Sequence, residues 1–257
     1  MGFFASEVER GACAAEFIGT FYLVLTIALT VLQSSALAPL AIGMMLAAMV
    51  FASAPSSGAH LNPAVTLGIW LTGRRLIPVR RMVLYVAAQC LGALAAGALS
   101  SHLLGSTVSL APGDGYTTAD AAMVEIVFST ALVFVALNTA TLARAFQPAH
   151  SADFAPLAIG FTVLAGAFAV GPVSGCALNP AAAVGLAVPH AMRVGWRKAG
   201  LGLLHIYVLC PFAGAAFAAL AFVFVRPSEY VLRSYRHAVE KEDSEVDVRT
   251  FEREHGH

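Results

Sequence analysis

The sequence predicts an all-α membrane protein with six transmembrane helices and two half-helices, arranged as an inverted repeat. Three observations support this fold class. The chain is 58% hydrophobic and only 12% charged, it contains several long apolar segments, and one loop motif occurs twice. A soluble domain could not cover so much apolar surface, so lipid must be the solvent of the first 225 residues. The formal net charge of zero gives no indication of a nucleic-acid partner.

The duplicated motif occupies residues 58–68 and 175–185, and each copy reads as a loop that turns into a helix at Asn-Pro-Ala. Asn is a favourable N-cap, and Pro suits the first helical position because its missing N–H has no partner there. The apolar runs that follow, residues 64–71 and 181–188, are short. At about 1.5 Å per residue such a helix crosses only about half of a ~30 Å hydrocarbon layer. Two interrupted segments at matching places indicate a pathway built at the membrane midplane.

The full spans are predicted, in chain order, at residues 13–32, 39–54, 82–104, 119–143, 154–170 and 199–225. The first follows a short polar lead and is not followed by a small-residue cleavage site, so we expect an uncleaved signal anchor. A strongly basic connection at residues 74–81 precedes the third span, and a loop rich in Gly and Pro at residues 105–118 follows it. We therefore expect a transmembrane domain at residues 1–227 and a charged tail at residues 228–257.

The two halves of this domain repeat beyond the loop motif. The pentapeptide at residues 39–43 returns at residues 156–160, with the same spacing that separates the two Asn-Pro-Ala motifs. The repeats are therefore predicted at about residues 10–105 and 119–226. Three spans separate the copies, and because that number is odd the second half is upside down relative to the first. The half-helices then enter from opposite membrane faces and meet at their N-termini.

This geometry predicts the chemistry of the meeting point. Each half-helix N-terminus carries about half a positive charge, so a cation between them is repelled from two sides. If the side-chain oxygens of Asn62 and Asn179 cap their helices, the amide N–H groups remain free to donate to a passing solute. The predicted pore-centre residues are Asn62, Pro63, Ala64, Asn179, Pro180 and Ala181.

The non-helical loops before the half-helices provide hydrogen-bond acceptors. Irregular backbone is tolerated at membrane depth only where it lines a water-filled cavity, so its carbonyl groups should face the path. The predicted carbonyl-bearing residues are Gly58, Ala59, His60, Gly175 and Ala177. The cysteines lack metal-binding spacing, and we expect neither a metal nor a cofactor. A path of this kind serves neutral hydrogen-bonding solutes and resists ions.

These residues resemble the aquaporin and aquaglyceroporin family, the major intrinsic proteins, from about residue 10 to about residue 225. The resemblance is carried by the paired Asn-Pro-Ala motifs, by Glu16 and Glu125, and by Gln89. It implies a homotetramer with one pore per subunit and both termini in the cytoplasm, in agreement with the basic connection at residues 74–81. Glu16 and Glu125 are interpreted either as a proton relay or as acceptors that brace the loops, with Gln89 in the same bracing set. Their symmetric placement and the resemblance favour bracing.

The outer selectivity filter of that family corresponds here to Ile42, Ala167, Cys176 and Ala182. The family usually has Arg at the place of Ala182, and a water-selective member normally has an aromatic residue at Ile42 and His at Ala167. Smaller or apolar residues at these places should widen the constriction and remove its fixed cation. The sequence therefore predicts a passive channel for water and small uncharged solutes such as glycerol, urea and ammonia, embedded in a lipid bilayer.

Alternative interpretations stay open at this point. The protein could be a water-selective channel with an unusual filter, or Arg193 or Arg197 could fold back to supply the missing charge. A secondary transporter for a small neutral solute would need a coupling-ion site, and an intramembrane enzyme would need a nucleophile paired with a base. Neither arrangement is evident in the sequence, so the channel prediction is favoured.

Overall fold

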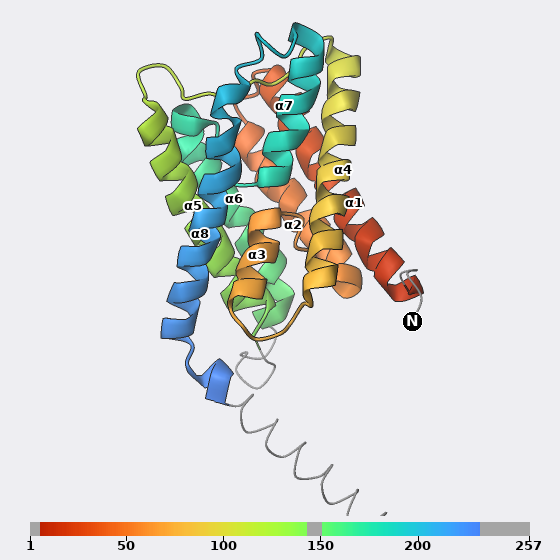
Figure 1. The fold of residues 1–257 in the computed structure, drawn as a ribbon, viewed down its shortest axis with the longest axis vertical. Coiled ribbons are helices and arrows are strands. Elements are labelled where there is room, and N and C mark those ends of the chain that lie inside the picture. Colours follow the sequence, from red (N-terminus) through yellow and green to blue (C-terminus); the bar gives the residue numbers. More distant parts are fainter. Residues whose placement is uncertain (1–5, 143–150, 232–257) are drawn as a thin grey trace, which may run out of the picture. The chain divides into compact units, whose positions relative to one another are not determined.

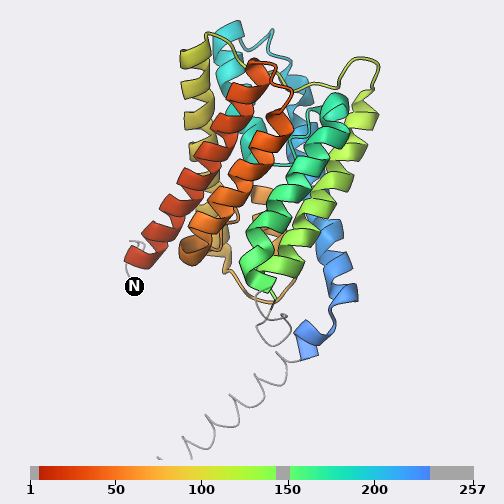
Figure 2. The same cartoon turned by 180° about the vertical axis from the view of Figure 1, so that it is seen from behind.

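The computed structural model describes residues 6–142 and 151–231, and all regular secondary structure in these ranges is helical (Figures 1 and 2). Six of the described helices are long and apolar enough to cross a membrane. Five of them are α1 (Glu7–Leu32), α2 (Ala38–Ser57), α4 (Val79–Leu104), α5 (Thr118–Ala140) and α6 (Ala155–Ser174). The sixth combines the short 3-10 helix η3 (Leu201–Leu203) with α8 (Leu204–Val225). The predicted all-α class is confirmed.

Two further helices, α3 (Pro63–Leu71) and α7 (Pro180–Val194), follow the two Asn-Pro-Ala motifs. They lie one above the other in Figure 1, with α3 in the lower half of the bundle and α7 in the upper half. A short 3-10 helix, η2 (Ser151–Phe154), precedes α6. Residues 1–222 form one compact unit, to which the descriptions below refer, and residues 223–257 form another. Positions 232–257 of the expected tail lie outside the described residues.

Several helix ends differ from the predicted boundaries. α1 begins at Glu7 because the Ser6 hydroxyl caps it, accepting a hydrogen bond from Glu9 N at 3.2 Å. α2 and α6 continue through Pro55 and Pro172 and each ends at a left-handed Gly. A proline removes only its own N–H from the hydrogen bonds of a helix. In a membrane protein, neighbouring helices and side chains can satisfy the freed backbone groups, so the helix can continue beyond the proline.

The second half-helix is longer than predicted, because α7 runs on to Val194 through Pro189. Pro189 leaves the carbonyl of Gly185 without its helical donor, and that carbonyl packs directly against Gly97 of α4. The last span starts later than predicted, since Gly200 takes a left-handed conformation and α8 begins only at Leu204.

The two halves pack by the same close helix crossings. On α4, a Cβ added at Gly92 would overlap the carbonyl of Phe17 of α1, and on α8 a Cβ added at Gly214 would lie 2.6 Å from the carbonyl oxygen of Ile126 of α5. Small residues at these crossings let the backbones of neighbouring membrane helices touch. The repeat visible in the sequence is therefore also present in the packing.

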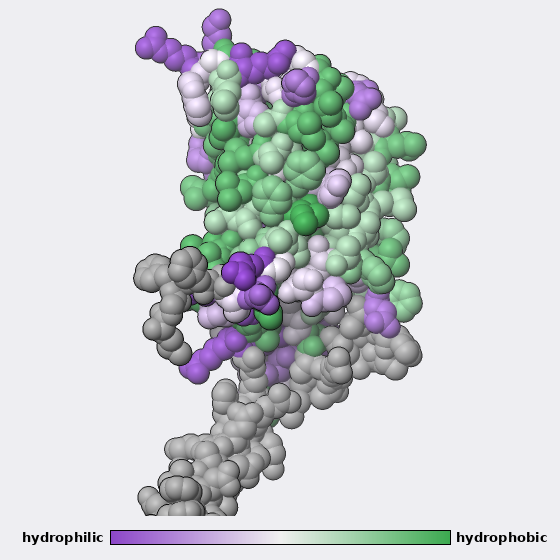
Figure 3. All heavy atoms as spheres, turned by 90° about the vertical axis from the view of Figure 1, so that its right-hand side faces the viewer, coloured by the Kyte–Doolittle hydropathy of each residue, from purple (hydrophilic) through white to green (hydrophobic). Residues whose placement is uncertain are grey.

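Apolar side chains form a belt between polar ends on the face shown in Figure 3. Large apolar residues that are more than half exposed include Phe51, Phe161, Phe217 and Leu220. Exposed aromatic and aliphatic groups of this size would aggregate in water but are solvated by lipid. Together with the six membrane-capable helices, the belt identifies a multi-pass membrane protein.

Both ends of the first unit lie at the basic connection between α3 and α4. Near its start, buried Glu9 pairs with Arg80, whose Nη1 lies 2.6 Å from both carboxylate oxygens. Near its end, the guanidinium carbon of Arg74 stands 4.2 Å from the ring centroid of Phe222. Arg74 also donates to the carbonyl of Thr141 at 2.9 Å, which links the loop after α3 to the end of α5.

Candidate functional site

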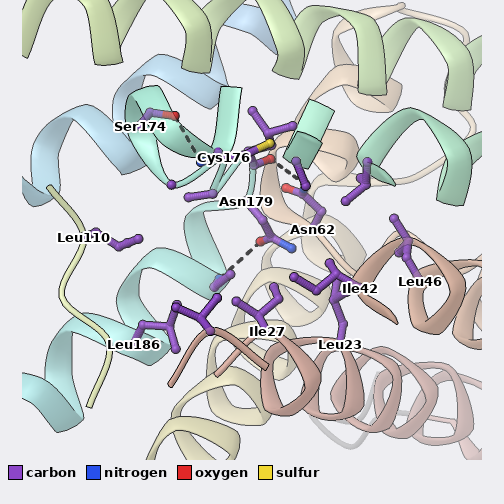
Figure 4. Close-up of a pocket in the computed structure, with 18 of the residues that line it drawn as sticks. Leu23, Ile27, Ile42, Leu46, Asn62, Leu110, Ser174, Cys176, Asn179 and Leu186 are labelled. Atoms are coloured by element: carbon purple, nitrogen blue, oxygen red, sulfur yellow. Dashed lines mark hydrogen bonds between the residues drawn. The ribbon is translucent and has the colours of Figure 1, made fainter. Parts of the chain in front are cut away.

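The two Asn-Pro-Ala asparagines cap the half-helices. Asn62 Oδ1 accepts a hydrogen bond from Ala64 N at 2.8 Å, and Asn179 Oδ1 accepts from Ala181 N at 3.0 Å and Ala182 N at 3.3 Å. In both motifs Pro occupies the first helical turn, where it costs no hydrogen bond. Each asparagine is 4% exposed, and the two lie close together beside the cavity shown in Figure 4.

The asparagine amides also join the two halves to each other. Asn62 Nδ2 donates to the carbonyl of Leu178 at 2.8 Å, and Asn179 Nδ2 donates to the carbonyl of Leu61 at 2.9 Å. We expected both N–H groups of each amide to be free for a solute, and this expectation is wrong for one of them. Because a primary amide carries two N–H groups, one on each asparagine still has no partner in the described part of the chain.

The loops before the half-helices have the same unusual backbone. Gly58 and Gly175 have φ values of 87° and 86°, and each is followed by two non-glycine residues with φ between 47° and 51°. These non-glycine residues are Ala59, Leu61, Cys176 and Leu178. A left-handed conformation costs a residue with a side chain about 1–2 kcal/mol, so strong interactions must hold both loops in place.

Glu16 holds the first loop. Its Oε1 accepts hydrogen bonds from Ser57 Oγ at 2.6 Å and from His60 N at 2.9 Å, and its Oε2 accepts from Leu61 N and from Gln89 Nε2, both at 2.7 Å. The carboxylate is fully buried. Four donors on one carboxylate explain how a charged side chain can be kept inside the membrane domain.

Glu125 holds the second loop in the same way. Its Oε1 accepts from Ser174 Oγ at 2.7 Å and from Ala177 N at 2.9 Å, and its Oε2 accepts from Leu178 N at 2.8 Å. Glu125 is also fully buried. The second loop has no counterpart of the Gln89 contact among the hydrogen bonds of the described residues, so the two halves are alike but not identical.

These bonds determine where the loop carbonyls point. The N–H groups of Ala59, His60 and Leu61 are all tied to side chains behind the loop. In a trans peptide the preceding C=O points the opposite way, and no described peptide bond is cis. The carbonyls so directed are those of Gly58, Ala59 and His60 in the first loop and, by the same argument, those of Gly175, Cys176 and Ala177 in the second.

No described residue donates a hydrogen bond to any of these six carbonyl oxygens. Sequence reasoning predicted acceptor carbonyls along both loops and named five of these six residues individually, with Cys176 assigned to the filter instead. It also did not single out the side chains of Ser57, Ser174, Thr66 and Tyr85. Ser57 and Ser174 donate to the two buried carboxylates, and they stand at the same spacing as the two asparagines. That shared spacing could have revealed them.

Two cavities lie along the loops. The larger, about 290 Å³, is lined by both asparagines and by Gly175 and Ala177. The smaller, about 280 Å³, is lined by Gly58 and Ala59. His60, Val65 and Ile159 line both, so the cavities adjoin at these three residues. His60 is held there by a contact of 3.1 Å between its Nδ1 and Thr66 Oγ1.

The four predicted filter residues all line the larger cavity, Ile42 from α2, Ala167 from α6, and Cys176 and Ala182 from either side of the second asparagine. Arg193 and Arg197 are exposed and line neither cavity, so the idea that one of them replaces the missing filter charge is wrong. Within the described residues, no Asp, Glu, Lys or Arg side chain lines either cavity, and no cluster of potential metal ligands is found.

The larger cavity has a further wall that the sequence did not predict. Val108, Ser109, Leu110 and Ala111, from the connection between α4 and α5, line it. Figure 4 shows Leu110 reaching from that connection toward the cavity. No periodicity or motif marks these residues.

Comparisons with known proteins agree with this geometry. The family model described as "Major intrinsic protein" matches residues 5–222. Aquaporin PIP2-4 of Oryza sativa subsp. japonica is 36% identical over 186 residues, covering 70% of this chain and 63% of that protein. Aquaporin PIP 1-3 of the same plant is 34% identical over 229 residues, covering 82% and 77%. Among solved structures, the aquaglyceroporin from Plasmodium falciparum superposes with a TM-score of 0.73 at 18% identity, covering 87% of this chain and 99% of that one.

Proposed function

Since this chain belongs to the major intrinsic protein family, whose members are channels and not enzymes, we propose that it is a passive pore for water and for small uncharged solutes such as glycerol, urea and ammonia. One observation carries the proposal. The larger cavity runs past the paired asparagines and adjoins the smaller one, and the described lining of both contains carbonyl or amide groups but no charged Asp, Glu, Lys or Arg side chain. Such a path offers hydrogen-bond donors and acceptors to a neutral solute and no side-chain charge to attract an ion.

Exclusion of cations follows from the half-helices. α3 and α7 both begin at the asparagine pair, so about half a positive charge from each helix is directed at the same place. Glu16 and Glu125 bind loop donors and line neither cavity, so neither carboxylate is a direct ligand for a cation there. The Asn62 and Asn179 amides each retain one N–H that can orient a water molecule at this point.

A wide range of neutral solutes is favoured by the composition of the outer filter. Ile42, Ala167, Cys176 and Ala182 present no fixed charge and no aromatic ring to the larger cavity. The proposal agrees with the similarity of the fold to a solved structure that is named an aquaglyceroporin. Polar solutes would then use the carbonyls of the second loop as acceptors while passing an otherwise apolar wall.

A water-selective channel is the second candidate, and one observation favours it. Relatives that are 33–36% identical to this chain include plant proteins named aquaporins. In this alternative the solute range is narrowed by residues outside the four filter positions.

We also propose a homotetramer with both termini and the tail at residues 228–257 in the cytoplasm, by analogy with the family. The orientation has support from charge. Glu9 and Phe222 contact Arg80 and Arg74, so both ends of the described bundle lie on the face of the basic connection. Positive residues favour the cytoplasmic side.

Stopped-flow light scattering on proteoliposomes tests the proposal. Water, glycerol, urea and ammonia permeation would be compared with that of empty vesicles. Fast flux of several solutes with a low activation energy supports the wide channel. Fast water flux without solute flux selects the water-specific alternative, and absence of any flux above that of empty vesicles refutes both.

A further inference from the structure

Residues from the connection between α4 and α5 pack against the apolar cluster that contains Ala182. Ala182 is only 1% exposed although it lines the larger cavity. It belongs to an apolar cluster with Ala181 and Leu186 of α7, and the side chains of Val108 and Leu110 pack against this cluster. Apolar side chains from the connection between α4 and α5 therefore lie beside the cluster that holds the filter position.

This connection is anchored on both sides of the covering residues. Before them, Thr107 Oγ1 lies 2.9 Å from Nδ1 of His190, which belongs to α7. After them, Gly113 N donates to the carbonyl of Val173 of α6 at 3.0 Å. A Cβ at Gly113 would overlap the carbonyl of Pro172, so only glycine permits this approach. The stretch between these anchors, which we call the covering segment (residues 108–111), lines the larger cavity along its whole length.

Within the covering segment, Leu110 contacts both the second loop and two apolar clusters. A methyl carbon of its side chain is 3.6 Å from where a Cβ on Gly175 would be, so it contacts the backbone of the second loop. The same side chain packs against the Ala182 and Leu186 cluster on one side and against the Ala183 and Tyr207 cluster on the other. Figure 4 shows Leu110 and Ile42 on opposite sides of the drawn cavity.

We propose that Leu110, with Val108 beside it, is a specificity-determining part of the outer filter. It replaces volume that the small Ala182 leaves empty, and it makes that wall apolar. Selection at this point then depends on the size and apolar surface of a neutral solute and not on a fixed charge. The inference deepens the proposed function and rests on it, because it assumes that solutes pass through the larger cavity.

Leu110→Ala and Leu110→Phe test this inference, with Leu220→Ala as the matched control. Leu220 is 68% exposed and lines neither cavity. The readout is the ratio of glycerol to water permeability in proteoliposomes. The ratio should rise at least about tenfold in Leu110→Ala, because a single methylene in an apolar pocket already alters discrimination by about that factor and this change removes three carbon atoms. It should fall in Leu110→Phe and stay unchanged in the control.

Wild-type ratios in both Leu110 variants would overturn the inference. Lost water flux would indicate that Leu110→Ala is unfolded, and Thr107→Val then provides a second test. It removes the anchor to His190 without altering Leu110. An unchanged ratio of glycerol to water permeability in Thr107→Val counts against the inference. The same measurements distinguish failure of this inference from failure of the proposed function. If the wild-type protein conducts only water, glycerol flux gained in Leu110→Ala still supports a filter role for Leu110.

Discussion

Replacing Glu125 by Gln tests whether the buried carboxylates brace the loops. The amide keeps the shape of the side chain but offers one acceptor oxygen instead of two. If that oxygen keeps the bonds from Ser174 and Ala177, the new NH₂ group faces Leu178 N, which now donates to Oε2 at 2.8 Å. One hydrogen bond to a charged group is lost, about 1.5–3 kcal/mol, and a buried N–H is left unsatisfied, about 1–3 kcal/mol. Together these losses amount to about 2.5–6 kcal/mol.

The assay is thermal unfolding in detergent together with water and proton permeability in proteoliposomes. A displaced second loop would move the carbonyl of Leu178 away from Asn62, so water permeability per folded protein should fall as well. Glu7→Gln is the control, because its side chain is 93% exposed and its pair with Arg10 should contribute less than about 1 kcal/mol. Wild-type stability combined with abolished proton flux in Glu125→Gln would refute bracing and support a proton relay.

Three further predictions concern the pore. Ala182→Arg should lower glycerol and urea permeability relative to water about tenfold, since it places a long charged side chain in the cavity beside an apolar wall; equal ratios would remove Ala182 from the filter. A membrane-impermeant mercurial should block water flux through the thiol of Cys176, which lines the larger cavity, and Cys176→Ser should abolish the block whereas Cys210→Ser should not. Asn179→Asp should make the pore measurably conductive to cations in planar bilayers, because a carboxylate offsets the two half-charges of the helix ends; no added conductance would show that the dipoles are not the barrier.

The fold was predictable because its signals are local or repeated. Span lengths follow from apolar runs, the half-helices begin at residues that suit an N-cap and a first turn, and the repeat appears as equal spacings in the sequence. Helix ends were less predictable where prolines lie inside helices. α7 continues through Pro189, and the Gly185 carbonyl that loses its helical donor packs against Gly97 of another helix, a contact that no local pattern contains.

The site was predictable to the extent that each residue acts within its own repeat. Asn62 and Asn179 cap their own helices, as the motif indicates. Their bonds to Leu178 and Leu61 cross between halves that are more than a hundred residues apart, so they exist only in the folded protein. Leu110 was missed for the same reason, because it meets the cluster of Ala182 only in the folded protein and shares no motif or periodicity with it.

The buried carboxylates explain how the path can be polar without being charged. Glu16 and Glu125 lie behind the loops and bind N–H groups, and each trans peptide then directs its carbonyl to the opposite side. The carboxylates thus orient the peptide dipoles of the loops. Because four donors already bind the Glu16 carboxylate, its oxygens are not available as ligands for a cation. Removing the charge should consequently disturb the path for neutral solutes more than the barrier to ions, which rests on the N-termini of α3 and α7.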